Sequence, residues 1–283
     1  QSSQEDICLS YCQIAHQKAQ EGEYDTAFSI VSQMLSKMQP ITNNTQVIMA
    51  HALHLLLDFA IERGDATLAE FMLPMIKAYE PLQYYEFKAK LFALREDFRS
   101  ALCTLHDYFV PREGNWKEII QVSLPLAVYY VEINAPALAL PYVLNGLSLS
   151  RKYNLHATIV EYKLVLADIY IQMNQMCKAE DLVEEIFSQA MNHIRAKVRA
   201  QVRLSKAKIM LLSTIQTKES KIEHETEDIG GSELILQLLL AARDEFVRLE
   251  SLQYVRESYY YLSLYYHNHN QEQERNEAAA QFS

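Results

Sequence analysis

Residues 167–183 read ADIYIQMNQMCKAEDLV and contain the pattern that decides the fold. Ala167 is followed three residues later by an aromatic residue, Tyr170, and after a short polar stretch Ala179 is followed four residues later by Val183. Spacings of three and four residues place side chains on one face of a helix. The segment therefore predicts two helices joined by a short turn, each with a small residue on its packed face.

The second half of this pattern recurs in phase along the chain. An alanine followed four residues later by valine or leucine stands at Ala27–Val31, Ala69–Leu73, Ala101–Leu105, Ala139–Val143 and Ala179–Val183. These five anchor alanines lie 32 to 42 residues apart. Such spacings bracket the ~34 residues of a tetratricopeptide unit and the ~40 residues of looser helical-hairpin repeats. One copy would mean little, but five copies predict a helical repeat.

Two further landmarks keep the same phase. Twelve residues before the anchors stand Ala15, Leu57, Ala89, Ala127 and Ala167, and nine residues before the last four anchors stand Ala60, Phe92, Tyr130 and Tyr170. Small side chains let two helices cross closely, and an aromatic ring three residues on fills the adjoining groove. The turns between the two landmarks begin at Gly22, Gly64, Glu96, Asn134 and Asn174. Glycine and asparagine favour the left-handed conformation that ends many helices.

The rhythm continues to the C-terminal end with one interruption. A long helix is expected from about Met191 to Leu212, followed by a polar segment, about 213–231, which we interpret as an exposed loop inserted within one repeat. Ala242 and Phe246 restore the second-helix landmark, whereas Arg275 takes the anchor position of the last hairpin. We therefore predict an all-α protein, an α-solenoid of about seven tetratricopeptide-like hairpins with an atypical last one. We expect a single superhelix over residues 1–283.

Composition narrows the classes of function. The net charge of −10, from 26 basic and 36 acidic residues, argues against nucleic-acid binding, which depends on clustered lysine and arginine. The chain contains no uninterrupted apolar stretch of ~18 residues and no basic-then-apolar leader. Its four cysteines are too sparse for a disulfide framework, and no glycine-rich phosphate-binding motif occurs. We expect a soluble intracellular protein without a membrane partner, and the start at Gln1 suggests a fragment.

Two clusters could suggest chemistry. Cys8, Cys12 and His16 are spaced for one helix face, but structural zinc needs four ligands, so buried thiols are favoured over a metal site. His54 and Asp58 lie one turn apart and could form a catalytic base and its orienting group. No nucleophile is identifiable beside them, which favours a partly buried, hydrogen-bonded histidine. We therefore predict no catalytic residue, no metal site, no cofactor and no small-molecule substrate.

A basic helix is the strongest candidate for a binding surface. Between Met191 and Leu212 there are six basic residues and no acidic one. Four of them advance by a helical turn at a time and form what we call the basic ridge, namely Arg195, Arg199, Arg203 and Lys206. It is either a solvated face, a contact for an acidic segment of a partner, or a contact for the chain's own loop. The acidic residues of that loop are Glu219, Glu223, Glu225, Glu227 and Asp228.

The C-terminal residues also resemble a known family. The pairs and runs that carry the resemblance are Tyr266-His267, Gln273-Glu274-Arg275-Asn276, the alanine-rich turn ending in Phe282, Ala241–Val247 and Arg256–Ser258. Together with the repeat phasing, they are similar to the end of the subunit 5 family of the anaphase-promoting complex. The family has no catalytic motif from which functional residues could be transferred.

The resemblance implies a non-catalytic scaffold subunit of a large ubiquitin ligase that controls the cell cycle and mitosis. Its partners would be other platform subunits of that complex, in the nucleus and the cytoplasm. The alternative is a generic tetratricopeptide adaptor that binds short peptides of partner proteins. Such adaptors usually line their first helices with Lys, Arg and Asn, whereas Ala52–Ile61 and Leu124–Val131 are mostly apolar here. Apolar faces of this kind suit permanent neighbours better.

Overall fold

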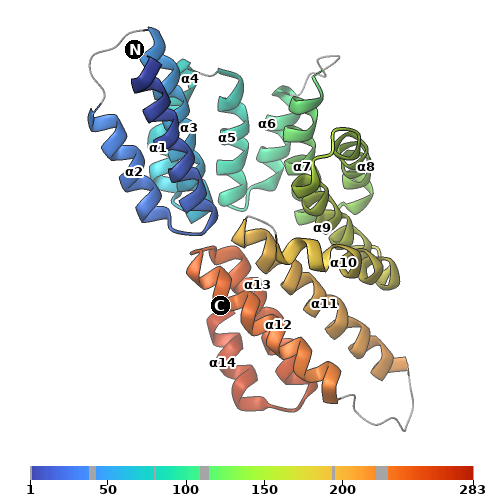
Figure 1. Ribbon diagram of the computed structural model, residues 1–283. Coiled ribbons are helices and arrows are strands. Elements are labelled where there is room, and N and C mark those ends of the chain that lie inside the picture. The colour runs from blue at the N-terminus through green and yellow to red at the C-terminus, as the bar shows by residue number, and fades with distance from the viewer. Residues whose placement is uncertain are drawn as a thin grey trace. The chain divides into compact units, whose positions relative to one another are not determined.

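The computed structural model describes residues 2–37, 43–79, 81–108, 115–192, 195–220 and 229–282. Within these ranges the regular structure consists of 14 helices and contains no strand (Figure 1). The helices belong to two compact units, residues Gln1–Ile133 and Asn134–Ser283. The predicted α-solenoid of tetratricopeptide-like hairpins is thereby confirmed. That the hairpins form one superhelix over residues 1–283 stays a prediction.

The first unit is built from seven helices among its described residues, and each packs beside the next. Their bounds are α1 (Ser2–Gln20), α2 (Tyr24–Lys37), α3 (Asn43–Arg63), α4 (Ala66–Tyr79), α5 (Pro81–Leu94), α6 (Phe98–Tyr108) and α7 (Trp116–Glu132). The odd-numbered helices carry the first landmark of each repeat, and α3 also contacts both α1 and α5. Successive hairpins therefore stack, as in a solenoid.

The second unit repeats this arrangement among its own described residues. Its helices are α8 (Pro136–Lys152), α9 (His156–Gln172), α10 (Met176–Met191), α11 (Ala196–Ser220), α12 (Ile229–Arg248), α13 (Leu252–Asn268) and α14 (Glu272–Phe282). Here α11 touches α9 on one side and α13 on the other, besides its own hairpin partner α12. This central position of α11 places its side chains between several neighbouring helices.

The predicted turns share one backbone geometry. A residue with positive φ, between +55° and +87°, lies five positions before each anchor, at Gly22, Gly64, Glu96, Asn134, Asn174 and Asn270. The next N–H donates to the carbonyl oxygen of the first-helix landmark, from Gln175 to Tyr170 at 2.8 Å and from Asp97 to Phe92 at 3.0 Å. This is the Schellman arrangement that closes a helix end. The landmark residue thus serves both packing and termination.

Burial confirms the assigned register. The five anchor alanines are fully buried at 0% exposure, and the landmark residues twelve positions before them are at most 1% exposed. In the last hairpin Arg275 stays partly exposed and donates to the side chain of Asn276, while Ala278 is buried instead. The last hairpin is atypical, as predicted, because a charged guanidinium cannot replace the methyl group of alanine at a helix crossing.

The interruption of the repeat is shorter than the sequence suggested. The segment predicted as a loop at about 213–231 is helical at both ends, since α11 continues to Ser220 and α12 begins at Ile229. Thr214 and Thr217 donate their hydroxyl hydrogens to the carbonyl oxygens of Met210 and Ser213, both at 2.8 Å, which lets polar residues extend the helix. Residues 221–228 lie outside the described ranges.

The structure also bears on membrane insertion. Among the helices of the described residues, none combines the length and the apolar character that crossing a bilayer requires.

Candidate functional site

The basic ridge is engaged with carboxylates of the same unit. Arg195, directly before α11, lies 3.2 Å from Glu161 of α9. Lys206 lies 2.7 Å from Glu184 of α10, with its ammonium 4.3 Å from the centre of the Phe187 ring. These two residues of the basic ridge therefore pair with two different helices, α9 and α10.

Glu245 of α12 gathers the remaining ridge residues. Its carboxylate pairs with Arg203 and lies 3.4 Å from Arg199 and 3.3 Å from Arg248. Only 13% of the Glu245 side chain is exposed, and about a quarter of the Arg199 and Arg203 side chains, so these three charges meet where water is partly excluded. Charge pairs in such places are stronger than surface pairs because screening is weaker. Glu245 thus offsets the repulsion between basic residues one turn apart. The sequence analysis had left open a solvated face, a partner segment and the chain's own loop, and had not identified Glu245.

One alternative for the basic ridge was a contact with the chain's own loop, and the acidic side chains of that loop fall outside the described part of the chain. Glu223, Glu225, Glu227 and Asp228 lie outside the described residues, and so does the side chain of Glu219. A role of the ridge in partner binding stays a prediction, but its premise is weaker, because all four side chains have carboxylate partners within the unit.

A charge reversal at the Glu245 cluster should destabilise the second unit. Arg203→Glu would place two carboxylates together in a largely buried site, and we expect it to lower the free energy of unfolding by about 2–3 kcal/mol. Arg195→Glu is the matched control, because that pair is more exposed and should change stability by less than about 1 kcal/mol. Urea unfolding measures both. Equal effects of the two reversals would contradict the special position of Glu245.

A second polar cluster bridges three first helices of the second unit. The Lys208 ammonium of α11 lies 3.7 Å from Asp168 of α9 and 3.3 Å from Glu257 of α13, and 5.3 Å from the centre of the Tyr261 ring. Burial lowers the pKa of Lys208, but the two carboxylates beside it outweigh burial and raise the pKa above its usual range. The lysine stays charged and ties α9, α11 and α13 together.

The protonation of Asp168 makes the contribution of this cluster to folding stability depend on pH. Burial raises the pKa of Asp168 to about 6 from its ordinary value of 3.8, although Lys208 acts in the opposite direction. Between these values the folded chain holds a proton that the unfolded chain has released, so this group stabilises the fold at low pH and the contribution is lost as pH rises through about 6. We predict that the wild type loses stability relative to Asp168→Asn between pH 4 and pH 7. A pH-independent difference in unfolding free energy would contradict this.

The first unit has a counterpart built on α3, α5 and α7. Lys90 lies 3.0 Å from both Asp58 and Glu86, and Glu86 also accepts a hydrogen bond from Gln121 of α7. Both units thus place a lysine and two carboxylates across neighbouring first helices. The sequence had singled out Asp58 but not Lys90, because the two lie 32 residues apart and meet only when the hairpins stack.

His54 is the partly buried, hydrogen-bonded histidine that the sequence favours. Its Nε2 lies 3.6 Å from Asp58, its Nδ1 contacts the side-chain oxygen of Gln83, and its ring packs on Phe87 at 4.9 Å between centres. Since Asp58 also pairs with Lys90, the carboxylate is part of the bridge between α3 and α5. The arrangement serves to join helices.

The three residues considered for a metal site, Cys8, Cys12 and His16, have different surroundings. Cys8 and Cys12 are buried, and the thiol of Cys12 lies 3.7 Å from the Met34 sulfur, whereas His16 contacts Gln20 at 2.8 Å. Burial raises the pKa of the Cys12 thiol, which disfavours the thiolate that zinc requires. No group of three or more potential metal ligands gathers among the described residues.

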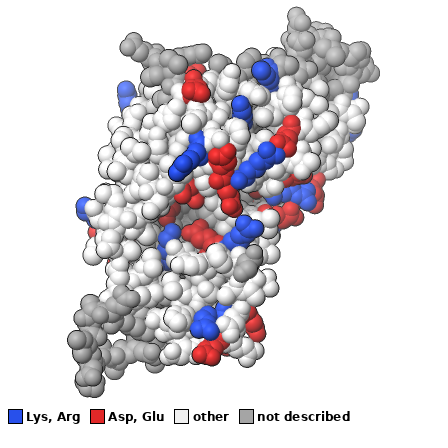
Figure 2. All heavy atoms as spheres, turned by 180° about the vertical axis from the view of Figure 1, so that it is seen from behind, with Lys and Arg blue, Asp and Glu red and all other residues white. Residues whose placement is uncertain are grey.

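The charge distribution fits protein partners better than a polyanion. On the coloured part of the face in Figure 2, basic and acidic side chains lie interleaved, without a broad field of one sign. Nucleic-acid surfaces instead concentrate lysine and arginine on one face.

Known proteins are similar to this chain over its whole length. Anaphase-promoting complex subunit 5 of Homo sapiens is 22% identical over 285 residues, that of Mus musculus 24% identical over 285 residues, and that of Rattus norvegicus 23% identical over 289 residues. The aligned region takes in 100% of this chain in each case. The chain is similar to subunit 5 along its entire length. It spans 37–38% of the length of these subunit 5 proteins, and no protein-family model matches it.

Solved structures share the fold. A Rap protein complexed with competence and sporulation factor aligns with a TM-score of 0.66 at 13% identity, covering 98% of this chain and 76% of the Rap chain. NprR in complex with its cognate peptide NprX aligns with a TM-score of 0.52 at 16% identity, covering 99% of this chain and 81% of NprR. At such low identity these likenesses establish the helical-repeat architecture and nothing more specific.

Proposed function

We propose that the chain is part of a non-catalytic scaffold subunit of an anaphase-promoting complex, in which it holds neighbouring protein subunits together for cell-cycle control. The observation that carries the proposal is the similarity to subunit 5 along the whole chain. The fold supports it, because stacked hairpins present long surfaces on which several proteins can be held at once. The partners would be other platform subunits, in the nucleus and the cytoplasm.

Co-purification tests this proposal. The full-length protein, tagged in the cells that make it, should recover other subunits of the anaphase-promoting complex in near-equal amounts, as judged by quantitative mass spectrometry. A tagged helical-repeat protein of similar size and charge serves as the control for non-specific capture. Recovery of the tagged protein without any of these subunits would overturn the proposal.

A peptide-binding adaptor is the second candidate. It is favoured by the structural likeness to a Rap protein and to NprR, each of which was solved in a complex with a factor or a cognate peptide. The two functions differ in how fast the partner dissociates, since a scaffold keeps its neighbours bound whereas an adaptor releases short peptides. Partners that dissociate within minutes on dilution would favour the adaptor, and partners that remain bound for hours would favour the scaffold.

A further inference from the structure

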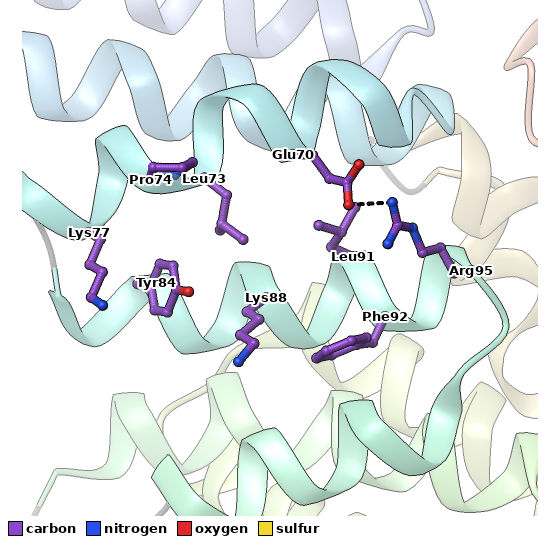
Figure 3. Close-up of a pocket in the computed structure, with 9 residues that line it drawn as sticks. All are labelled: Glu70, Leu73, Pro74, Lys77, Tyr84, Lys88, Leu91, Phe92 and Arg95. Atoms are coloured by element: carbon purple, nitrogen blue, oxygen red, sulfur yellow. Dashed lines mark ion pairs between the residues drawn. The ribbon is translucent and has the colours of Figure 1, made fainter.

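The first unit contains a pocket of about 430 Å³ between α4 and α5, whose lining includes the repeat landmarks Leu73 and Phe92. Figure 3 shows its lining, which comprises Glu70, Leu73, Pro74 and Lys77 of α4 and Tyr84, Lys88, Leu91, Phe92 and Arg95 of α5 and its end. Leu73 and Leu91 are buried and form the apolar floor. The positions Glu70 to Lys77 extend over about 10 Å of helix, which matches about three residues of an extended peptide.

The two ends of this pocket differ in charge. At one end Glu70 and Arg95 neutralise each other in an ion pair (Figure 3). Lys77 lies at the opposite end, 5.2 Å from the centre of the Tyr84 ring, and Lys88 stands 5.7 Å from the centre of the Phe92 ring. Neither lysine forms an ion pair with a described residue. Two ammonium groups that pair with no carboxylate of the described ranges thus border an apolar pocket.

An exposed apolar strip continues the pocket on the outer side of α4. Phe71 is 70% exposed and Met75 is 40% exposed. Phe71 neighbours both Pro74 and Met75 on the helix surface, because residues three and four positions apart adjoin there. Pro74 has no N–H, so the Glu70 carbonyl oxygen lacks its usual intrahelical donor beside the pocket. The strip and the floor together favour an occupant with apolar side chains.

We propose that this pocket binds a short acidic segment of a partner protein, whose bulky apolar side chain enters between Leu73 and Leu91 and whose carboxylates meet Lys77 and Lys88. The net charge of the chain does not oppose this, since exposed charges are screened beyond about 8–10 Å and the two nearby ammonium groups dominate. The proposal deepens the scaffold function and rests on it for its biological setting.

Peptide selection tests the site without the assembled complex. Short random peptides displayed on phage are selected on the purified 283-residue chain, and the enriched peptide is then titrated by fluorescence anisotropy. We expect a consensus that combines Asp or Glu with Leu, Phe or another bulky apolar residue. Its affinity should fall at least about tenfold in Lys77→Glu/Lys88→Glu and decrease at high salt. Phe71→Ser should weaken binding without affecting folding, because that side chain is largely exposed.

A matched double reversal controls for charge. Lys37 and Lys117 are exposed lysines of the first unit that, like Lys77 and Lys88, rest near aromatic rings, but they lie outside the pocket. Lys37→Glu/Lys117→Glu should therefore leave affinity nearly unchanged. A basic consensus, no consensus, or equal losses in both double variants would overturn the proposal. Self-association of the chain that Lys77→Glu/Lys88→Glu abolishes, without an enriched peptide, would assign the pocket to a second copy and overturn it as well. Failure here alongside successful co-purification would leave the scaffold function standing.

Discussion

Gly146→Ala should lower the free energy of unfolding by about 2 kcal/mol, although alanine is the better helix former. Within α8, a Cβ atom at this position would lie 2.1 Å from Cζ and 2.3 Å from the hydroxyl oxygen of Tyr162 in α9. Tyr162 is fully buried, so its ring has no room to move aside. Overpacking of this kind typically costs ~1–3 kcal/mol, and it must first offset the gain of up to about 1 kcal/mol that Gly→Ala gives in a helix.

Urea unfolding of four variants isolates this clash, namely Gly146→Ala, Ser148→Ala, Tyr162→Leu and the double variant Gly146→Ala/Tyr162→Leu. Ser148→Ala, on the exposed side of the same helix, should change stability by less than about 0.5 kcal/mol. Tyr162→Leu removes the ring, so Gly146→Ala should cost much less in that background than in the wild type. Gly146→Ala variants as stable as the wild type would show that α8 and α9 do not approach as closely as described.

Ala179→Leu should destabilise the second unit by about 1–3 kcal/mol. Ala179 is 0% exposed, within a cluster that includes Val160, Leu164 and Ala167, so the added carbon atoms have no space. Glu180→Leu is the matched control, because the neighbouring side chain is exposed and should tolerate the change. An unchanged melting curve for Ala179→Leu would refute the repeat register.

The hairpins could be predicted because their determinants are local and repeated. The turn at Glu96 illustrates this, since glutamate has no preference for the left-handed conformation and only its phase relative to Ala101 identified the turn. At Arg275 the phase of the repeat located the last hairpin, and the charged side chain at the anchor position indicated that this hairpin differs from the others. The extension of α11 to Ser220 was missed, because its polar residues indicated a loop. In the structure the hydroxyl groups of its threonines donate to backbone carbonyl oxygens one turn earlier, so these residues fit within a helix.

The site residues depended on contacts that the sequence does not display. The basic ridge was visible as a pattern, but Glu245 lies 42 residues beyond Arg203 and reaches it only through the pairing of α11 with α12. Its position beside the landmark Phe246 was the one available clue. The proposed pocket between α4 and α5 depends on Lys77 and Lys88 pairing with no carboxylate among the residues that the structure describes, and this property emerges only in the folded unit.

Depletion of the protein from the cells that make it, followed by gradient sedimentation of the other anaphase-promoting complex subunits, tests the scaffold function most directly. If the chain holds neighbouring subunits together, those subunits should shift from one large particle to smaller assemblies, and wild-type protein should restore the large particle. Subunits that sediment unchanged as one intact complex after depletion would contradict the scaffold function.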